Sequence, residues 1–202
     1  VNYENKSCYY GEWDTTNIKR HGRGILLWSD GSKYQGYFKN DQVNVKGKLL
    51  HRDGNYYEGE WLNDKVNGYG IYCHSDGARY EGNWENDKQS GEGKEIWQDG
   101  SLYEGHYKNG MKSGLGKFKW SDGAIFTGNF ENNNINGYGV YIWKDKRCYD
   151  GEWVNNKMEG KGIFSWPDGR KYEGEYKNDK KEGTGSFFWP DGRIFIGKQI
   201  LF

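Results

Sequence analysis

A repeat of 23 residues constrains the fold of this chain more than any single motif in it. Aromatic residues head the units at Tyr9, Tyr34, Tyr57, Tyr80, Tyr103, Phe126, Tyr149, Tyr172 and Phe195, and from Tyr34 onward they stand 23 residues apart. In most units a glycine follows two positions later, and then come a Gly-x-Gly pair and an Asp-Gly pair. A strict short period is the signature of a repeat array. We therefore predict one continuous array over residues 1–202, in which Phe195 begins a partial last unit.

The glycines belong to this repeat rather than to a catalytic loop. Of the 32 glycines, all but Gly110 fall into the repeated columns. The Gly-x-Gly pairs precede strand-like segments, whereas a phosphate-binding loop leads into a helix. Glutamates such as Glu58 and Glu60 recur in register, so they indicate a solvated stripe rather than the carboxylate pair of a glycosidase. We predict no catalytic residues and interpret the chain as a non-enzyme.

Composition limits both the core and the partners. Apolar residues make up 34% of the chain and aromatic residues 18%, so a core has to be built from Trp and Tyr packed over glycine. The 29 basic and 29 acidic residues cancel, which leaves no net field to attract nucleic acid. Three cysteines in unrelated columns indicate free thiols in a reducing compartment. We find no signal peptide and no apolar run long enough to span a membrane, and we expect a cytoplasmic protein.

Each unit has the pattern of a β-hairpin. Alternation along residues 57–61 puts Tyr57 and Trp61 on one face of a strand. The Asn-Asp-Lys sequence at 63–65 is a turn signal between the two strands of this hairpin. Between hairpins, the Trp-Pro-Asp-Gly sequence at 166–169 predicts a type I turn that ends in a left-handed glycine.

Consecutive hairpins joined by such tight turns must pair edge to edge. We therefore predict an all-β fold, namely an elongated, single-layer antiparallel meander of about eight to nine hairpins of 23 residues, twisted into a solenoid-like rod. Two positions depart from the pattern, because Val45 replaces a glycine of Gly-x-Gly and Lys146 replaces a turn glycine. Each must either take a positive φ or remodel its turn. One face would form a groove for a protein partner, lined by Tyr57, Trp61, Tyr72, Tyr80, Trp84, Trp97, Tyr103, Tyr107, Phe118, Trp120, Trp143, Trp153 and Trp166.

The columns Tyr-x-Gly-x-Trp, Gly-x-Gly and Asp-Gly resemble the MORN (membrane occupation and recognition nexus) repeat over essentially the whole chain. The resemblance implies an all-β, non-catalytic scaffold or adaptor. An unbroken array rich in Asn and Lys is most similar to the cortical-cytoskeleton scaffolds of protists, in particular apicomplexans. This implies a cytoplasmic location at the cortical cytoskeleton, on the inner face of a membrane-associated skeleton, with cytoskeletal or cortical proteins as partners. A ciliary axoneme component and a regulatory repeat segment of a larger protein are the alternatives.

The last unit predicts self-association. Its residues are apolar in a sequence that is otherwise short of aliphatic side chains, and an uncovered sheet end of this kind needs a cover. Pairing across a two-fold axis is the simplest cover, and the cortical MORN scaffolds that the chain resembles are associated with end-to-end dimers. The alternative is that the tail folds back as an intramolecular cap. We predict a homodimer, or a higher oligomer, with an interface of Trp189, Ile194, Phe195, Ile196, Ile200, Leu201 and Phe202.

The sequence also supports one phospholipid hypothesis and one metal hypothesis. A row of turn lysines, Lys65, Lys88, Lys157 and Lys180, could contact phosphoinositide or phosphatidic acid headgroups, so a phospholipid-binding membrane-targeting module is the alternative function. His51 and His74 share one column, with Cys73 adjacent, and a zinc ion held between two chains is the corresponding metal hypothesis. We otherwise expect no cofactor.

Overall fold

The computed structural model describes Val1 and residues 6–199, and every regular element in this part of the chain is a β-strand. The chain divides into two compact units, Val1–Gln98 with Lys108–Gly110 and Asp99–Tyr107 with Met111–Phe202. Within each unit, successive strands pair antiparallel in chain order. The predicted all-β meander of hairpins is therefore confirmed. The continuity of the array over residues 1–202 stays a prediction.

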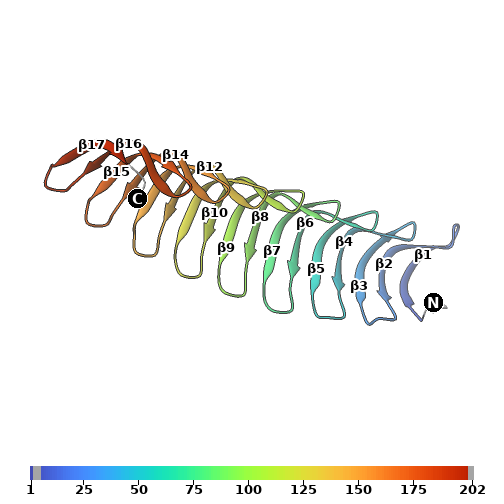
Figure 1. The fold of residues 1–202 in the computed structure, drawn as a ribbon. Helices are drawn as coiled ribbons and strands as arrows, with labels where there is room; N and C mark the ends of the chain where they lie inside the picture. Colours follow the sequence, from blue (N-terminus) through green and yellow to red (C-terminus); the bar gives the residue numbers. More distant parts are fainter. Residues whose placement is uncertain (2–5, 200–202) are drawn as a thin grey trace. The chain divides into compact units, whose positions relative to one another are not determined.

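A hairpin consists of a leading strand of 7 residues and a returning strand of 9 residues, and Figure 1 shows this arrangement repeating along each unit. The first unit contains β1 (Cys8–Asp14), β2 (Lys19–Leu27), β3 (Lys33–Lys39), β4 (Gln42–Leu50), β5 (Tyr56–Leu62), β6 (Lys65–Cys73), β7 (Arg79–Glu85) and β8 (Lys88–Ile96). The second contains β9 (Leu102–Lys108), β10 (Met111–Lys119), β11 (Ile125–Glu131), β12 (Asn134–Ile142), β13 (Cys148–Val154), β14 (Lys157–Ser165), β15 (Lys171–Lys177), β16 (Lys180–Phe188) and β17 (Ile194–Gln199).

Glycines face one another across neighbouring strands and form a floor for the aromatic rings. Gly36 of β3 pairs with Gly24 of β2 on one side and with Gly47 of β4 on the other. The ring of Tyr34 lies directly over Gly36 and Gly47, where any Cβ atom would overlap it. Glycine is therefore required here because the ring needs the space, not because the backbone is unusual.

The head rings are buried by rings from two repeats. Tyr34 is 0% exposed and packs edge-on against Phe38 of its own hairpin, with ring centroids 5.2 Å apart. Trp61 of the next hairpin covers it from the other side at 5.5 Å. Edge-to-face geometry is the favoured arrangement of aromatic pairs. The core is therefore a chain of local contacts between neighbouring repeats, as in other repeat proteins.

From β3 onward, the hairpin ends are two-residue loops that also join neighbouring hairpins. Asn63 and Asp64 both have positive φ, 49° and 65°, as a type I′ turn requires. The backbone N–H of Val43 donates to Asp64 Oδ1 at 2.6 Å, and the N–H of Asp64 donates to the Val43 carbonyl at 3.0 Å. The same two bonds link Met158 and Asp179 in the second unit, at 2.8 and 3.0 Å. Each turn is thus fixed to the hairpin before it.

Both departures from the glycine pattern adopt the conformation of the residue they replace. Val45 has φ 65°, within the range of 60° to 95° that the glycines of its column span. Lys146 has φ 69°, and its N–H donates to the Trp143 carbonyl at 2.9 Å, as the N–H of Gly169 does to the Trp166 carbonyl at 3.0 Å. The turn is therefore kept, and the backbone is strained at these two positions.

Replacing Val45 by glycine is expected to stabilise the protein by about 1 kcal/mol, because a β-branched residue at positive φ is strained. Val45 is 58% exposed, so the change removes little buried apolar surface. Val154, which is 47% exposed in β13, is the matched control, and Val154→Gly is expected to destabilise by about 1 kcal/mol. Urea unfolding measures both. Destabilisation by both variants would contradict strain at Val45.

Stability is expected to fall as the pH rises above about 10. Burial raises the pKa of Tyr103 from 10.0 to about 12, and it also raises the pKa values of Tyr34, Tyr57, Tyr80, Tyr149 and Tyr176. Below pH 10 these phenols are neutral in both states, so they add no pH dependence. Above it they ionise only in the unfolded chain, which shifts the equilibrium towards unfolding. Monitoring phenolate absorbance and circular dichroism together should show buried tyrosines ionising only as the strands unfold; their ionisation in the folded state would contradict the prediction.

Candidate functional site

The aromatic residues assigned to a partner groove fall into two groups. Tyr57, Trp61, Tyr80, Tyr103, Tyr107 and Trp153 are at most 7% exposed. These rings form the core between repeats, where a partner cannot reach them without separating the hairpins. Alternation in the sequence placed them on the correct face but gave no sign that the next repeat covers them. Tyr72, Trp84, Trp97, Phe118, Trp120, Trp143 and Trp166 are half-buried and present part of their rings at the surface.

Most of the half-buried rings of the second unit stack into one continuous row, which we call the aromatic ladder. Neighbouring ring centroids are 4.5 to 5.5 Å apart, with ring planes inclined by 37° to 50°. Only Phe164 is buried; the other rings keep partial exposure. The ladder consists of Phe118, Trp120, Tyr141, Trp143, Phe164, Trp166, Phe187 and Trp189. In the first unit the same columns contain Leu26, Leu49, His51, His74 and Glu95 beside the aromatic residues Trp28, Tyr72 and Trp97, so the row of aromatic rings is interrupted there.

An arginine stacks on each of the last three tryptophans of the ladder. Arg147, Arg170 and Arg193 lie over Trp143, Trp166 and Trp189, with the guanidinium carbon 5.7, 5.4 and 5.4 Å from the ring centroid. In all three, the arginine Nε donates to an aspartate Oδ2 at 2.7 Å, and these aspartates are Asp145, Asp168 and Asp191. We call each set of three residues a Trp–Arg clasp. The sequence repeat contained this signal, because Arg follows Trp by four positions in these units only.

Lys181 adds a further cation to the ladder. Its Nζ lies 4.4 Å from the ring centroid of Tyr172, 4.9 Å from that of Trp166 and 5.3 Å from that of Phe187. Burial lowers the pKa of this ammonium, and the nearby charge of Arg170 lowers it further. The Trp166 ring therefore lies beside two cations, whereas its clasp contains one carboxylate.

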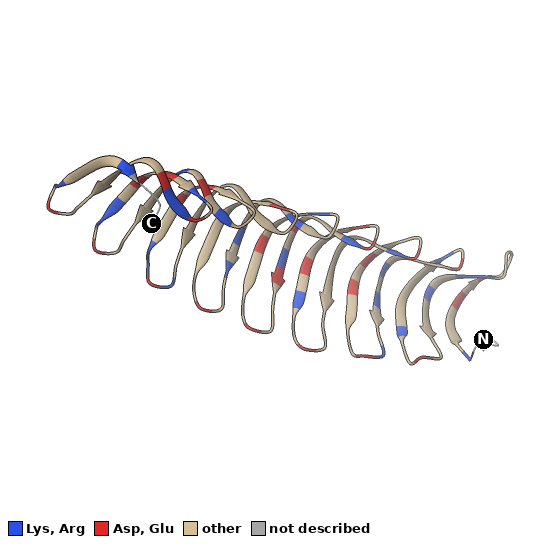
Figure 2. Cartoon of the chain, in the orientation of Figure 1, with Lys and Arg blue, Asp and Glu red and all other residues tan. Residues whose placement is uncertain are grey.

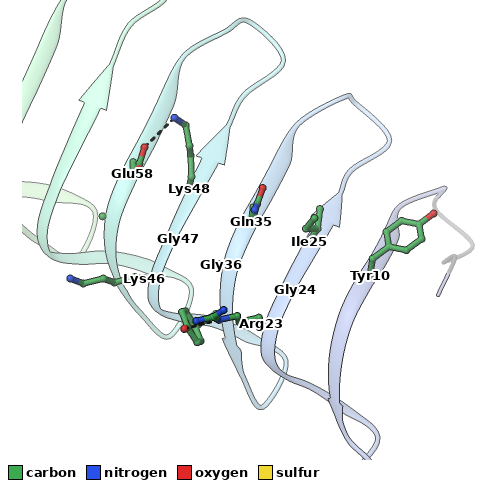
Figure 3. A pocket seen from close by; sticks show the side chains of 12 residues that line it. Tyr10, Arg23, Gly24, Ile25, Gln35, Gly36, Lys46, Gly47, Lys48 and Glu58 are labelled. Carbon is green, nitrogen blue, oxygen red and sulfur yellow. Dashed lines mark hydrogen bonds and ion pairs between the residues drawn. The ribbon is translucent and has the colours of Figure 1, made fainter.

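A hollow of about 760 Å³ lies over strands β1 to β5 of the first unit (Figure 3). Its floor is backbone at Gly24, Gly36, Gly47 and Gly59. Its cations already have partners, because Arg23 Nε donates to the Tyr37 hydroxyl at 2.8 Å and Lys48 pairs with Glu58 at 3.1 Å. Lys46 lies 3.8 Å from Glu60. The lining contains three cations and one carboxylate, but because each cation already has a partner, the hollow does not point to a particular ligand.

The last strand exposes apolar side chains. Ile194 is 59% exposed, Phe195 50% and Ile196 71%. Trp189 is half-buried and packs on Phe187, with ring centroids 4.5 Å apart. The other predicted interface residues, Ile200, Leu201 and Phe202, lie outside the described residues.

The predicted lysine row consists of exposed residues at the starts of strands. Lys65 and Lys88 begin β6 and β8 in the first unit, and Lys157 and Lys180 begin β14 and β16 in the second. The aspartates that precede three of these lysines, Asp64, Asp87 and Asp179, each accept a hydrogen bond from the backbone of the preceding hairpin. Lipid contact by this row stays a prediction.

The histidines and cysteines do not form a metal cluster in the part of the chain that the structure describes. The ring of His74 packs against Tyr72 at 4.8 Å, while His51 is half-buried one repeat earlier. Cys8, Cys73 and Cys148 form no disulfide and are half-buried. Zinc held between two chains stays a prediction. Within the described residues, no helix is long and apolar enough to cross a membrane.

These features define a β-hairpin repeat protein whose core is formed between neighbouring repeats. The sequence pattern of the MORN repeat matches the chain at residues 9–33, 34–56, 57–79, 80–102, 103–125, 126–146, 149–169 and 172–192. The chain therefore belongs to the MORN repeat family. None of the curated proteins compared with it matches in sequence.

Solved structures with a similar fold include domains of the protein CPAP. The TCP10 domain of CPAP from Danio rerio is similar with a TM-score of 0.53 and 10% sequence identity, over 98% of this chain and 92% of that one. The G-box domain of the microcephaly protein CPAP gives a TM-score of 0.51 at 10% identity, over 99% of this chain and 97% of that one. At this identity the likeness shows the fold alone.

Proposed function

We propose that this protein is a non-catalytic scaffold that binds other proteins and pairs with a second copy of itself through its C-terminal repeats. The observation that carries the proposal is the exposure of β17. Phe195 is 50% exposed, whereas the equivalent head residues of the other repeats, such as Tyr34 and Tyr149, are at most 3% exposed. Two such edges related by a two-fold axis would cover each other.

The interface of this dimer would contain Trp189 and the exposed residues Ile194, Phe195 and Ile196 of β17. Ile200, Leu201 and Phe202 are included in the proposed interface only because the sequence is apolar at these positions. Partner proteins would contact the half-buried aromatic rings rather than the core rings, because only the former present surface. In the first unit these are Tyr72, Trp84 and Trp97.

The cortical cytoskeleton is the cellular location that we propose for this scaffold, with the apicomplexan type as the nearest functional parallel. Membership of the MORN family supports a scaffold. The G-box domain of CPAP, which shares the fold of this chain, has a suggested role in centriole elongation, a cytoskeletal process. Imaging of the tagged protein tests the location: cortical signal supports it, and axonemal or diffuse signal contradicts it.

Light scattering and small-angle X-ray scattering test the dimer. The chain is expected to have twice its monomer mass, and Ile196→Lys is expected to return it to a monomer, because a charge would be buried in the interface. Leu115→Lys is the matched control, since Leu115 is 65% exposed in β10 and lies outside the interface. A chain ending at Gly192 should behave as Ile196→Lys does. A monomeric parent chain, or dimers in all variants, would contradict the proposed interface.

Co-sedimentation with anionic vesicles separates this proposal from membrane targeting. A scaffold without lipid affinity stays in the supernatant at physiological salt. Salt-sensitive pelleting that is lost when Lys65, Lys88, Lys157 and Lys180 are replaced by glutamine would instead support the phospholipid-binding module.

A further inference from the structure

The spacing of the aromatic ladder matches one backbone conformation. Equivalent tryptophans, such as Trp143 and Trp166, are separated by two strands. Two strand spacings amount to about 9.6 Å. A polyproline II helix has three residues per turn and rises about 9.3 Å per turn. A polyproline II segment lying across the strands would therefore place every third residue against an equivalent tryptophan. Because this conformation is already extended, little entropy is lost on binding.

The charge around the ladder favours an acidic segment. The ladder turns at 143–147, 166–170 and 189–193 contain five cationic and three acidic residues, and Lys181 raises the number of cations to six. The remaining ladder turn, at 120–124, contains one acidic residue and no cation, so the surplus lies at the last three tryptophans. The corresponding turns of the first unit, at 28–32, 51–55 and 74–78, contain one cationic and three acidic residues. Figure 2 shows both signs of charge along both units, so the surplus at the ladder is local rather than a property of the whole chain.

Lys181 is the position where a carboxylate would gain most. Its ammonium lies against the rings of Tyr172 and Trp166, on which Arg170 also stacks. The carboxylate of Asp168 pairs with Arg170, and within the described residues Lys181 has no ion pair. Each guanidinium has five N–H donors, and Asp168 takes only the Nε–H, so further donors are available to a second carboxylate.

We propose that the aromatic ladder binds an acidic segment of a partner protein in the polyproline II conformation, with its apolar residues on Trp143, Trp166 and Trp189 and its carboxylates on Arg170 and Lys181. The proposal rests on the proposed scaffold function and names the chemistry of one partner. The clasps and Lys181 set the specificity for acidic segments. The aromatic rings alone would accept the apolar residues of an acidic, a neutral or a basic segment equally well.

Isothermal titration calorimetry of the full chain with synthetic peptides tests whether the aromatic ladder binds an acidic polyproline II segment. A peptide of repeated Pro-Pro-Glu is expected to bind, and binding should weaken as salt is added. A repeated Pro-Pro-Lys peptide should fail to bind, because its charge opposes that of the ladder. A repeated Gly-Gly-Glu peptide should bind at least about tenfold more weakly, because it has the charge but neither the preformed conformation nor the apolar residues that contact the tryptophans. Equal affinity for all three peptides would overturn the proposal.

Single substitutions then locate the binding site. Lys181→Gln is expected to weaken Pro-Pro-Glu binding about tenfold, the usual order for one charge-assisted contact. Arg170→Gln should do the same, although it also opens a turn, so Lys181→Gln decides the outcome. Arg52→Gln, in a turn of the first unit that lacks a tryptophan, is the matched control and should bind as the parent does. Unchanged binding by Lys181→Gln would overturn the assignment.

The result is separable from that of the dimer test. A chain that forms dimers but binds none of the peptides keeps the scaffold function and loses this partner. A chain that binds the Pro-Pro-Glu peptide as a monomer keeps the partner and loses the proposed dimer. Binding to anionic vesicles through Lys181, without peptide binding, would replace the acidic peptide by a membrane surface and contradict the proposal.

Discussion

Replacing Gly162 by alanine is expected to destabilise the protein by about 3 kcal/mol, far more than a methyl group usually costs on a strand. A Cβ atom at Gly162 would overlap the ring of Tyr149. That ring is 0% exposed and is held by Trp153 and Tyr176, at centroid distances of 5.1 and 5.0 Å. Its hydroxyl also donates to the Glu152 carbonyl at 3.1 Å. The ring cannot move aside without opening the contact between two repeats.

Gly123→Ala is the control for this prediction. Gly123 has φ 95° and nothing within 4 Å of a Cβ atom, so its substitution is strained only in the backbone. We expect a loss of about 1–2 kcal/mol there. The free energies of unfolding of both variants in urea compare the cost of overlap with a ring with the cost of backbone strain. If Gly162→Ala costs no more than Gly123→Ala, then the glycines under the rings are not kept by packing.

Replacing Trp153 by alanine is expected to cost about 4 kcal/mol, as for other buried tryptophans. Trp153 is 5% exposed and touches the rings of Tyr149 at 5.1 Å and Phe126 at 5.7 Å. Its Nε1–H donates to the Gly139 carbonyl at 3.0 Å. The side chain thus joins three strands of neighbouring hairpins. Its loss would leave a cavity and an unpaired carbonyl between them.

Trp153→Phe separates the ring from the hydrogen bond. Phe130 occupies the same column in the preceding repeat and is 6% exposed, so a phenyl ring fits this position. We expect Trp153→Phe to cost about 1 kcal/mol for the lost N–H donor, plus a smaller packing term. Thermal unfolding of both variants measures the difference. Equal losses would mean that the hydrogen bond, rather than ring packing, dominates this contact.

The hairpins were predictable because their signals are local. Asn63 and Asp64 predict one turn and residues 166–169 predict another, because the conformation of a turn depends on a few adjacent residues. The strained conformations at Val45 and Lys146 were foreseen as one of two outcomes, and a positive φ at both positions is the outcome observed. Within the described residues, the repeat period also gave the number and order of the hairpins.

Contacts between repeats were not predictable in the same way. The carboxylate of Asp64 accepts a hydrogen bond from the backbone N–H of Val43, 21 residues earlier, and the local turn sequence does not reveal this contact. Alternation held along residues 57–61, since the rings of Tyr57 and Trp61 pack together, but the pairing register with the returning strand shifts between Gly59 and Trp61. A shift of this kind depends on both strands together, and residues 57–61 alone do not reveal it.

The sequence by itself determined the repeat, the all-β hairpins, the turn positions and the face on which the aromatic rings lie, because a side chain's face follows from alternation along one strand. Only the tertiary structure decided which rings are accessible. Tyr57 and Trp84 share a face, but the first is 2% exposed and the second half-buried, since burial depends on the ring that the next repeat supplies. The same reason separates the closed core from the aromatic ladder: packing between hairpins, and not the pattern within one, sets the surface that a partner can reach.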